Sequence, residues 1–568
     1  MKKPAWHMPF RTALLITGAL ACTNAPATDS APAASVSRPV TLGKTAPPPR
    51  TMLLGNLGSY HRAITTQSAD AQRFFDEGLT LLYGFNHAEA FRSFARAAAL
   101  DTAAPMPHWG MALALGTNIN DIAPVDRLKT AHAHLADAVA RRANRSAVEQ
   151  GLIDALGKRY IADPTGDQMP REQAYSDAMR ALTKQFADDP DIATLYAESL
   201  MNLRPWKLYK ADGTPAPETA TIVATLEAVL RSQPDHPGAN HYYVHAVEAS
   251  AHPERAIISA RRLETLVPGA GHLVHMPAHI YIRTGDYTRS ALANATAAAV
   301  DDTYFKATGT SGLYSDIYYS HNLQFEAAAA MFSGNLSEAR DAAHHTVLLT
   351  GPIADQMAML EPFAAMELFV AVRFERWADV TAVTAPPAKR TLQTVLYHWA
   401  RGAAFAATGN VPDAAASLQA LTAVMPLIPA DAMVGPSNTA RAVAAVAKAD
   451  LAGRVALGRG ELNTAIAAFS DAVAAEDRLG YNEPPDWLLP EREMLGRALL
   501  RAGRAARAEL VFRADLTRNV GSPRSRFGVW QSLKAQHKPF DGARLLFNAA
   551  WSPSNIGPPW EIDSAASK

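Results

Sequence analysis

Four histidines in two short segments have the residue type and spacing of a metal site. His241 and His245 lie in the segment NHYYVHAVE, and His275 and His279 lie in GHLVHMPAHIY. Residues four apart lie on one face of a helix, so each pair presents two imidazoles together. Each member of the second pair follows its counterpart by 34 residues (241 to 275, 245 to 279). A pair copied in register indicates equivalent helices of consecutive structural repeats, with one site between them.

The elements that position these residues are expected to be pairs of helices. Hydrophobic residues make up 48% of the chain, and no segment has a convincing strand pattern. Small and apolar residues recur at fixed places of a 34-residue unit, at its positions 8, 11, 20, 24 and 27. In the first unit these are Gly78, Leu81, Ala90, Phe94 and Ala97. The pattern resembles that of the tetratricopeptide repeat (TPR) superfamily.

The resemblance implies an all-α fold. We expect a TPR-type right-handed helical superhelix, an α-solenoid of antiparallel helix pairs, over residues 69–536. Irregular insertions are expected near 204–217, which is marked by Pro and Gly, and near 481–490, where Pro484 and Pro485 exclude a helix. Residues 537–568 are expected to form a C-terminal cap or tail.

In TPR proteins the first helix of each repeat lines a concave groove through repeat positions 2, 5, 9 and 12. Placed on this frame, ionisable residues of four consecutive repeats fall on one stripe of the groove. They are Glu198, His241, His245, Glu248, His272, His275, His279 and His321. Trp109 falls on the same stripe nearer the N-terminal end, where it would stack on a ligand or fill the narrow end of the superhelix.

Histidine combined with carboxylate is suited to Zn, Fe, Cu or Mn. We expect His241, His245, His275 and His279 to be the ligands of such a transition metal, with Glu248 as a further ligand or a catalytic general base. Four more residues are expected around the ion or against a bound ligand: Glu198, His272, His321 and Trp109. The alternative is that the histidines bond to neighbouring tyrosines and backbone groups, or give a polar groove for a peptide.

Two segments, GHLVHMPAHIY and YNEPPDW, resemble segments that recur in a group of large exported bacterial TPR proteins. That resemblance implies no particular activity. The sequence has no HExxH, phosphate-binding loop, dinucleotide-binding glycine pattern or nucleophile elbow. The reaction, if there is one, therefore stays open.

Three functions remain. The first is an exported TPR lipoprotein whose groove binds a transition metal and a ligand. The second is a TPR scaffold of the cell envelope without metal, whose groove holds an envelope protein, a peptide or a small molecule. The third is a metal-dependent hydrolase or oxygenase.

The N-terminal sequence indicates export. Residues 1–21 are typical of a signal peptide, and Cys22, the only cysteine, directly follows the apolar stretch, as in bacterial lipoproteins. A tether rich in Pro, Ala and Ser is expected at 22–68. We expect the protein on the periplasmic side of the outer membrane, or soluble in the periplasm or secreted, with the membrane contacted only through the lipid. The balance of 54 basic and 54 acidic residues argues against nucleic acid as a partner.

Overall fold

The structure is a computed structural model that describes residues 52–210 and 213–560. Throughout these residues the regular elements are helices, and β-pairing is limited to three isolated bridges. The expectation of an all-α fold is confirmed. The predicted signal peptide at 1–21, Cys22 and residues 561–568 lie outside the described part of the chain.

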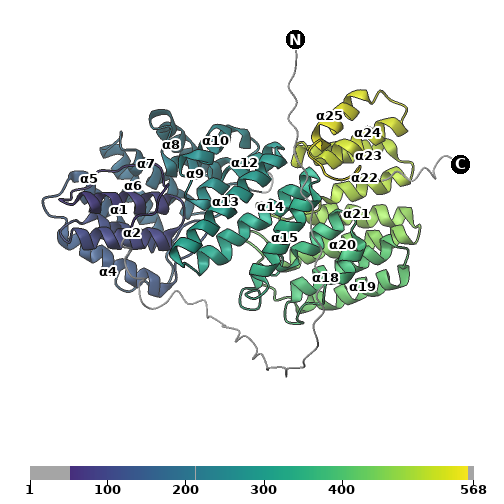
Figure 1. Cartoon of the computed structure of the whole chain (residues 1–568), viewed down its shortest axis with the longest axis horizontal. Helices are drawn as coiled ribbons and strands as arrows, with labels where there is room; N and C mark the ends of the chain where they lie inside the picture. The colour runs from purple at the N-terminus through teal and green to yellow at the C-terminus, as the bar shows by residue number, and fades with distance from the viewer. Residues whose placement is uncertain (1–51, 211–212, 561–568) are drawn as a thin grey trace, which may run out of the picture. The chain divides into compact units, whose positions relative to one another are not determined.

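The first half of the array runs from α1 to α13 (Figure 1). Its helices are α1 (Ala69–Tyr83), α2 (His87–Leu100), α3 (Met106–Ala114), α4 (Val125–Arg141), α5 (Ala147–Leu156), α6 (Met169–Gln185), α7 (Pro190–Asn202), α8 (Thr219–Ser232), α9 (Pro237–Val247), the 3-10 turn η1 (Pro253–Ala256), α10 (Ile257–Leu266), α11 (Gly271–His275), α12 (Pro277–Thr284) and α13 (Tyr287–Thr308).

The second half begins with a short π-helical turn, η2 (Tyr314–Tyr319). It continues with α14 (Ser320–Ser333), α15 (Leu336–Thr350), the 3-10 turns η3 (Ala358–Leu360) and η4 (Phe363–Ala365), α16 (Met366–Arg373), α17 (Trp377–Ala382), α18 (Thr391–Ala407), α19 (Val411–Val424), the turn η5 (Met425–Leu427), α20 (Ala440–Gly458), α21 (Leu462–Glu476), α22 (Glu491–Arg501), α23 (Ala505–Arg518), α24 (Pro523–Ala535) and α25 (Asp541–Trp551).

Consecutive helices pack as antiparallel pairs, and each pair packs on the next, as in a TPR array. Glycine on one helix lets an aromatic ring of its neighbour approach closely. A Cβ at Gly78 or at Gly110 would lie 2.7 or 2.6 Å from the ring of Phe94, which therefore sits between α1 and α3. Phe512 is held in the same way between Gly496 and Gly528. The small residues that identified the repeat are thus points of helix contact.

The turn inside a helix pair has one recurring form. The backbone N–H that begins the second helix donates to a carbonyl five residues earlier, at 2.8 to 3.0 Å. This closing bond leaves the preceding residue in the left-handed region, where glycine is favoured. Glycine fills that position at 285, 334, 409, 460 and 503, whereas Phe85 and Glu375 fill it at φ 56° and 53°. Phe85 becomes important below.

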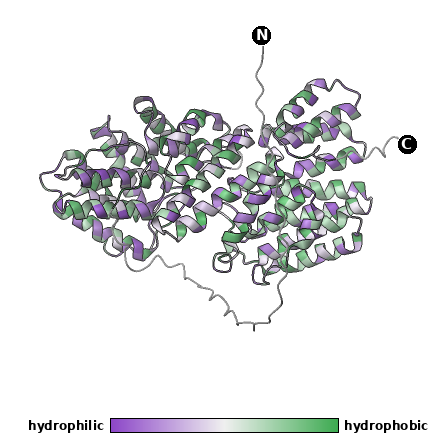
Figure 2. Cartoon of the chain, viewed as in Figure 1, coloured by the Kyte–Doolittle hydropathy of each residue, from purple (hydrophilic) through white to green (hydrophobic). Residues whose placement is uncertain are grey.

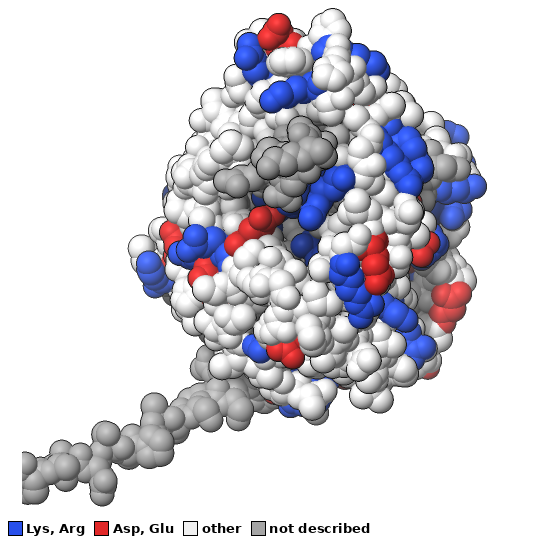
Figure 3. All heavy atoms as spheres, turned by 90° about the vertical axis from the view of Figure 1, so that its right-hand side faces the viewer, with Lys and Arg blue, Asp and Glu red and all other residues white. Residues whose placement is uncertain are grey.

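The helices carry apolar residues on the faces that pack and polar residues on the others (Figure 2). On the face drawn in Figure 3, acidic and basic side chains are scattered among uncharged ones, as the balanced composition predicts. No helix among the described residues is long and apolar enough to span a bilayer.

The prediction that the tether extends to residue 68 is wrong for residues 53–67. The backbone N–H of Leu54 donates to Glu77, the Tyr60 hydroxyl donates to Asp191, and Arg62 forms an ion pair with Asp191. This segment contains apolar side chains that pack on the first core, unlike the run of Pro, Ala and Ser before it. It is therefore part of the folded array.

The C-terminal part contacts the middle of the chain. Phe547 and Trp560 join the core of the last helices, and Ser554 donates to the carbonyl of Gly334 in the α14–α15 turn. The indole of Trp487, between α21 and α22, packs on Trp399 with ring centroids 5.0 Å apart. Residues 541–560 therefore act as a cap.

Gly110→Ala is expected to lower the free energy of unfolding by about 1–3 kcal/mol, because the new methyl group would meet the ring of Phe94 in a filled core. The midpoint of urea unfolding, followed by circular dichroism, measures the effect. Gly542→Ala in the exposed part of α25 is the matched control, since no atom lies within 4 Å of its new Cβ. Equal midpoints for the two variants would contradict the packing described here.

Candidate metal centre

Six histidines from four helices lie in contact in the interior of the array. They are His241 and His245 of α9, His272 and His275 of α11, His279 of α12 and His321 of α14. The first five are at most 5% exposed, and His321 is partly exposed. The histidines therefore lie inside the protein, where an open groove surface was expected.

A break between α11 and α12 divides the second histidine segment. Pro277 has no N–H and its ring excludes the regular helical position of the carbonyl four residues before it, so the helix restarts there. His272 and His275 precede the break and His279 follows it. The break gives these three imidazoles different directions, which spacing on a straight helix does not predict.

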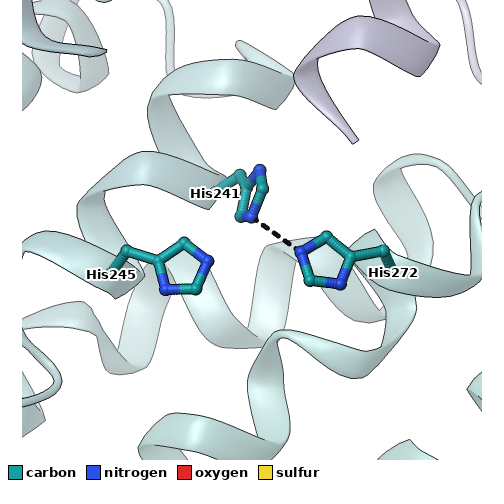
Figure 4. Close-up of side chains that lie close together, drawn as sticks. All are labelled: His241, His245 and His272. Carbon is teal, nitrogen blue, oxygen red and sulfur yellow. Dashed lines mark hydrogen bonds between the residues drawn. The ribbon is translucent and has the colours of Figure 1, made fainter. Parts of the chain in front are cut away.

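The first triad consists of His241, His245 and His272 (Figure 4). The rings from α9 and α11 turn toward one another, and each residue offers a ligand atom within 4.8 Å of those of the other two. The Nε2 atoms of His241 and His272 are 3.2 Å apart. Three nitrogens at such distances suit a single transition-metal ion.

The second triad consists of His275, His279 and His321, whose ligand atoms also lie within 4.8 Å of one another. The Nε2 atoms of His275 and His279 are 2.8 Å apart. The sequence predicted one set of four ligands, His241, His245, His275 and His279. The structure divides these four between two triads and adds His272 to the first and His321 to the second.

Glu248 lies between the triads and contacts one histidine of each. Its Oε1 is 2.8 Å from Nδ1 of His245, and its Oε2 is 2.6 Å from Nδ1 of His279. A carboxylate only accepts hydrogen bonds, so Nδ1 of His245 carries a proton. Nδ1 of His279 pairs with the carboxylate at ion-pair distance. Both oxygens are therefore engaged with imidazoles, and Glu248 acts here as a positioning residue.

Two more histidines are oriented in the same way. Nδ1 of His241 donates to the backbone carbonyl of Tyr83 at 2.5 Å. Nδ1 of His275 donates to Oδ1 of Asn294 at 2.6 Å, and the Asn294 amide is fixed because its nitrogen donates to the carbonyl of Ser290. With Nδ1 protonated, a neutral imidazole presents the lone pair of Nε2.

Phenylalanine rings cover the triads. Phe85 contacts all three members of the first triad, with ring centroids 4.5 to 6.0 Å away. Phe325 contacts all three members of the second triad at 5.2 to 5.6 Å. Trp206, with a backbone φ of 59°, approaches His245 at 5.7 Å from another side. Phe85 and Trp206 both hold left-handed conformations that are unfavourable for bulky residues, a feature common at functional sites.

Burial determines the charge state of most of these imidazoles. It lowers the pKa of His241, His272 and His275 well below the usual value, and neighbouring imidazoles lower it further. Burial also opposes ionisation of Glu248, but its contacts with His279 and His245 outweigh this and hold the pKa of the carboxyl below its usual range. Burial also lowers the pKa of His279, but the charge of Glu248 outweighs this and raises that pKa above its usual value. The other histidines of the cluster are thus neutral and able to donate a lone pair.

A small pocket of about 20 Å³, with room for about one water-sized molecule, adjoins the first triad. His245 and Glu248 form part of its wall, and Arg204, Trp206 and Tyr481 form other parts. The last three belong to the two irregular insertions, so these insertions lie at the edge of the pocket. A small ligand in this pocket would reach the wall formed by His245.

The two segments singled out by the second family resemblance meet in space. Arg283, just after GHLVHMPAHIY, lies over the ring of Tyr481 at 5.5 Å and 3.9 Å from Oε1 of Glu483. Burial raises the pKa of Glu483 to about 7, although the charges of Arg283 and His279 lower it. The segment YNEPPDW is therefore next to the histidine cluster, about 200 residues along the chain from it.

Two predicted site residues lie elsewhere. Glu198 of α7 is buried against Asn202, whose amide donates to it, and near the charge of Arg159. Trp109 is 1% exposed and donates to the carbonyl of Leu152, so it is part of the core and not of a groove surface. The groove stripe of the repeat frame is filled by packing at these positions.

Other residues of the site were not predicted. Phe85 had a usable signal, because it replaces the glycine typical of the repeat turn. Asn294 and the carbonyl of Tyr83 had none, since an asparagine in a helix and a backbone atom carry no mark of a role.

Comparison with known proteins gives no family assignment. No protein-family model matches the chain, and no curated protein matches it. Among solved structures, a human IFIT1 dimer with m7Gppp-AAAA is 11% identical, covers 87% of this chain and 92% of its own, and has a TM-score of 0.28. The P58(IPK) TPR domain is 12% identical, with 77% and 99% covered and a TM-score of 0.21. Yeast Tom70 is 10% identical, with 86% and 92% covered and a TM-score of 0.24. At these values the likenesses say nothing about ligand or activity.

Glu198→Gln is expected to change how stability depends on pH. Burial raises the pKa of Glu198 to about 7 in the folded state. The folded protein then binds more protons than the unfolded one between about pH 4.5 and 7, so this carboxyl lowers stability as pH rises through that range. The side-chain amide that replaces Glu198 does not ionise, so the variant does not lose this stability as pH rises. The free energy of unfolding of the variant, minus that of wild type, should rise by up to about 3 kcal/mol from pH 4.5 to 7.5. Parallel curves from urea unfolding would exclude this role.

Phe85→Gly and Glu375→Gly make the same change at equivalent turns, and their effects should differ in sign. Each substitution removes the strain of a non-glycine residue in the left-handed region, which should raise the free energy of unfolding by about 1–2 kcal/mol. Glu375 loses only a half-exposed ion pair with Arg497, so that variant should be neutral or up to about 1 kcal/mol more stable. Phe85 loses its packing on three imidazoles, and a net loss of about 1–3 kcal/mol is expected in urea unfolding. Similar gains for both would show that Phe85 contributes no packing.

Proposed function

We propose that this protein binds a transition metal through its buried histidine cluster and presents the bound ion to a small ligand in the adjoining pocket. Export, with Cys22 as a lipid anchor, belongs to the proposal and rests on the N-terminal sequence alone. The TPR-type array supplies the consecutive, closely packed helices on which the ligands converge.

One observation carries the proposal. The Nδ1 atoms of His275 and His279 contact the acceptors Asn294 and Glu248, while their Nε2 atoms lie 2.8 Å apart. In their neutral forms, two imidazoles held in this way direct lone pairs at each other, which is repulsive unless a cation joins them. Imidazole ligands of metals are oriented by this kind of bond from the opposite nitrogen.

A proton shared between the two Nε2 atoms is the competing arrangement, with His279 charged against Glu248. It accounts for one pair of nitrogens only. Nε2 of His245 is buried and has no hydrogen-bond partner in the part of the chain that the structure describes. An unpartnered buried nitrogen costs about 1–3 kcal/mol. Coordination of a metal ion uses this atom, and the shared proton does not.

The donor set favours particular ions. Calcium and magnesium prefer oxygen ligands, and six imidazoles offer none. Manganese also prefers carboxylates. Within residues 52–210 and 213–560, Glu248 is the one carboxylate in contact with the imidazoles, and it is engaged with two ring nitrogens. Zinc, copper and iron, which bind imidazole well, fit the cluster.

An ion held by three imidazoles keeps a coordination position for water or another small ligand. The pocket beside His245 would supply that ligand. Hydrolysis or oxygenation at such an ion is the catalytic form of the proposal, but Glu248 is not a free general base in it, because its oxygens already contact His245 and His279.

His245→Ala/His279→Ala is expected to abolish most metal binding, because it removes one ligand from each triad. Protein purified without a histidine tag is analysed for metal by mass spectrometry after desalting. His344→Ala/His345→Ala is the matched control, since it removes two exposed histidines outside the cluster. Wild type and control should carry stoichiometric metal, and the cluster variant about a tenth or less.

Equal metal content in the cluster variant and the control would exclude the histidine cluster as the binding site. Absence of metal from wild type, before and after incubation with Zn²⁺ or Cu²⁺, would leave the metal-free scaffold as the remaining function. A peptide or envelope protein would then be the expected partner.

A further inference from the structure

We infer that the cluster holds two metal ions, one in each triad, and that the ions are copper. This rests on the proposed function and specifies the number and kind of ions. The first ion would be bound by His241, His245 and His272, and the second by His275, His279 and His321.

The distances inside each triad suit one ion. Three nitrogens around a tetrahedral ion at 2.0–2.1 Å lie about 3.3 Å apart. One pair of nitrogens is 3.2 Å apart in the first triad, and one pair is 2.8 Å apart in the second. All ligand atoms of a triad lie within 4.8 Å of one another. Small side-chain adjustments would complete either site.

The orientation of the rings separates the two sites. His241 and His272 direct Nε2 at each other, and His275 and His279 do the same. A single ion between the triads would require one ring of each pair to turn away from its partner. For His241, His275 or His279 the turn would also break the contact of Nδ1 with its acceptor. The Nε2 atoms thus converge within the triads, not between them.

Each triad is also surrounded by equivalent contacts. Glu248 holds one imidazole of each, His245 in the first and His279 in the second. Phe85 touches every member of the first triad and Phe325 every member of the second. The triads are adjacent, because the rings of His272 and His275 have centroids 5.6 Å apart, as do those of His245 and His279. Two ions would therefore be close neighbours.

Charge points to copper. Six imidazoles add no negative charge, and Glu248 is the one carboxylate among the described residues in contact with them. Two divalent ions would place four positive charges in a buried site against one negative charge, which is costly. Copper is stable as a monovalent ion, which halves the positive charge, and among divalent ions it binds nitrogen sites most strongly.

The test counts copper ions in each triad separately. Untagged full-length protein is stripped with a chelator, incubated with excess Cu²⁺ with or without ascorbate, desalted, and analysed for copper per chain. His272→Gln weakens the first triad and His321→Gln the second, and the amide keeps a polar side chain of similar size. His344→Gln, at an exposed position, is the control. Circular dichroism restricts the comparison to folded variants.

We expect about two copper ions per chain in wild type and control, and about one in each triad variant. Paramagnetic resonance of the Cu²⁺ form gives a second readout that does not depend on counting. Two neighbouring ions should broaden or weaken the signal in wild type, while each triad variant gives the sharp signal of an isolated ion. Offered equimolar Zn²⁺ and Cu²⁺, wild type should retain copper.

One ion per chain in wild type, lost completely in both variants, would overturn the two-ion inference and leave metal binding intact. Retention of zinc in preference to copper would overturn the choice of copper. No bound metal in wild type under any condition would instead exclude the proposed function itself. If the glutamine variants do not fold, the wild-type stoichiometry and resonance signal still decide between one ion and two.

Discussion

The contacts of Glu248 with His245 and His279 are the interaction on which the site depends. One buried carboxylate joins α9 to α12, and so joins two consecutive repeats through their imidazoles. In helical repeat arrays, each unit is stabilised by its interface with the neighbouring units. Here a charged group in the interior must be satisfied by two ring nitrogens. The relative position of the repeats at this point is therefore fixed by polar geometry as well as by packing.

A chain of polar contacts connects this site to the N-terminal segment. Arg62 pairs with Asp191, Asp191 accepts from the hydroxyl of Tyr83, and the carbonyl of Tyr83 accepts from His241. Tyr83 thus faces two ways, with its ring toward α7 and its backbone toward the first triad. The segment at 53–67 supports the orientation of a histidine far from it in sequence.

Much of the fold could be predicted because repeat periodicity is a local property. Gly78 and Phe94 marked a helix pair, and the structure packs one on the other. The position of the histidine cluster followed from the same frame. The division into triads did not, because the restart of the helix at Pro277 redirects His279 relative to His275. Trp109 and Glu198 fell on the right stripe but are buried by packing that no single-repeat pattern contains. The position of Tyr481 beside the pocket depends on the number of repeats between it and the histidines. Residue spacing within a single repeat does not show that number.

That dependence limits how the array could change in evolution. A repeat protein gains or loses units readily when each unit contacts only its neighbours. The wall of the pocket beside His245 includes Trp206, which precedes the histidine repeats in the chain. It also includes Tyr481, which lies in the connection between α21 and α22. Insertion or deletion of a helix pair between α14 and α21 would carry Tyr481 and Glu483 away from Glu248. The site therefore fixes the number of helix pairs between α14 and α21. In this stretch, units cannot be gained or lost independently as in other repeat proteins.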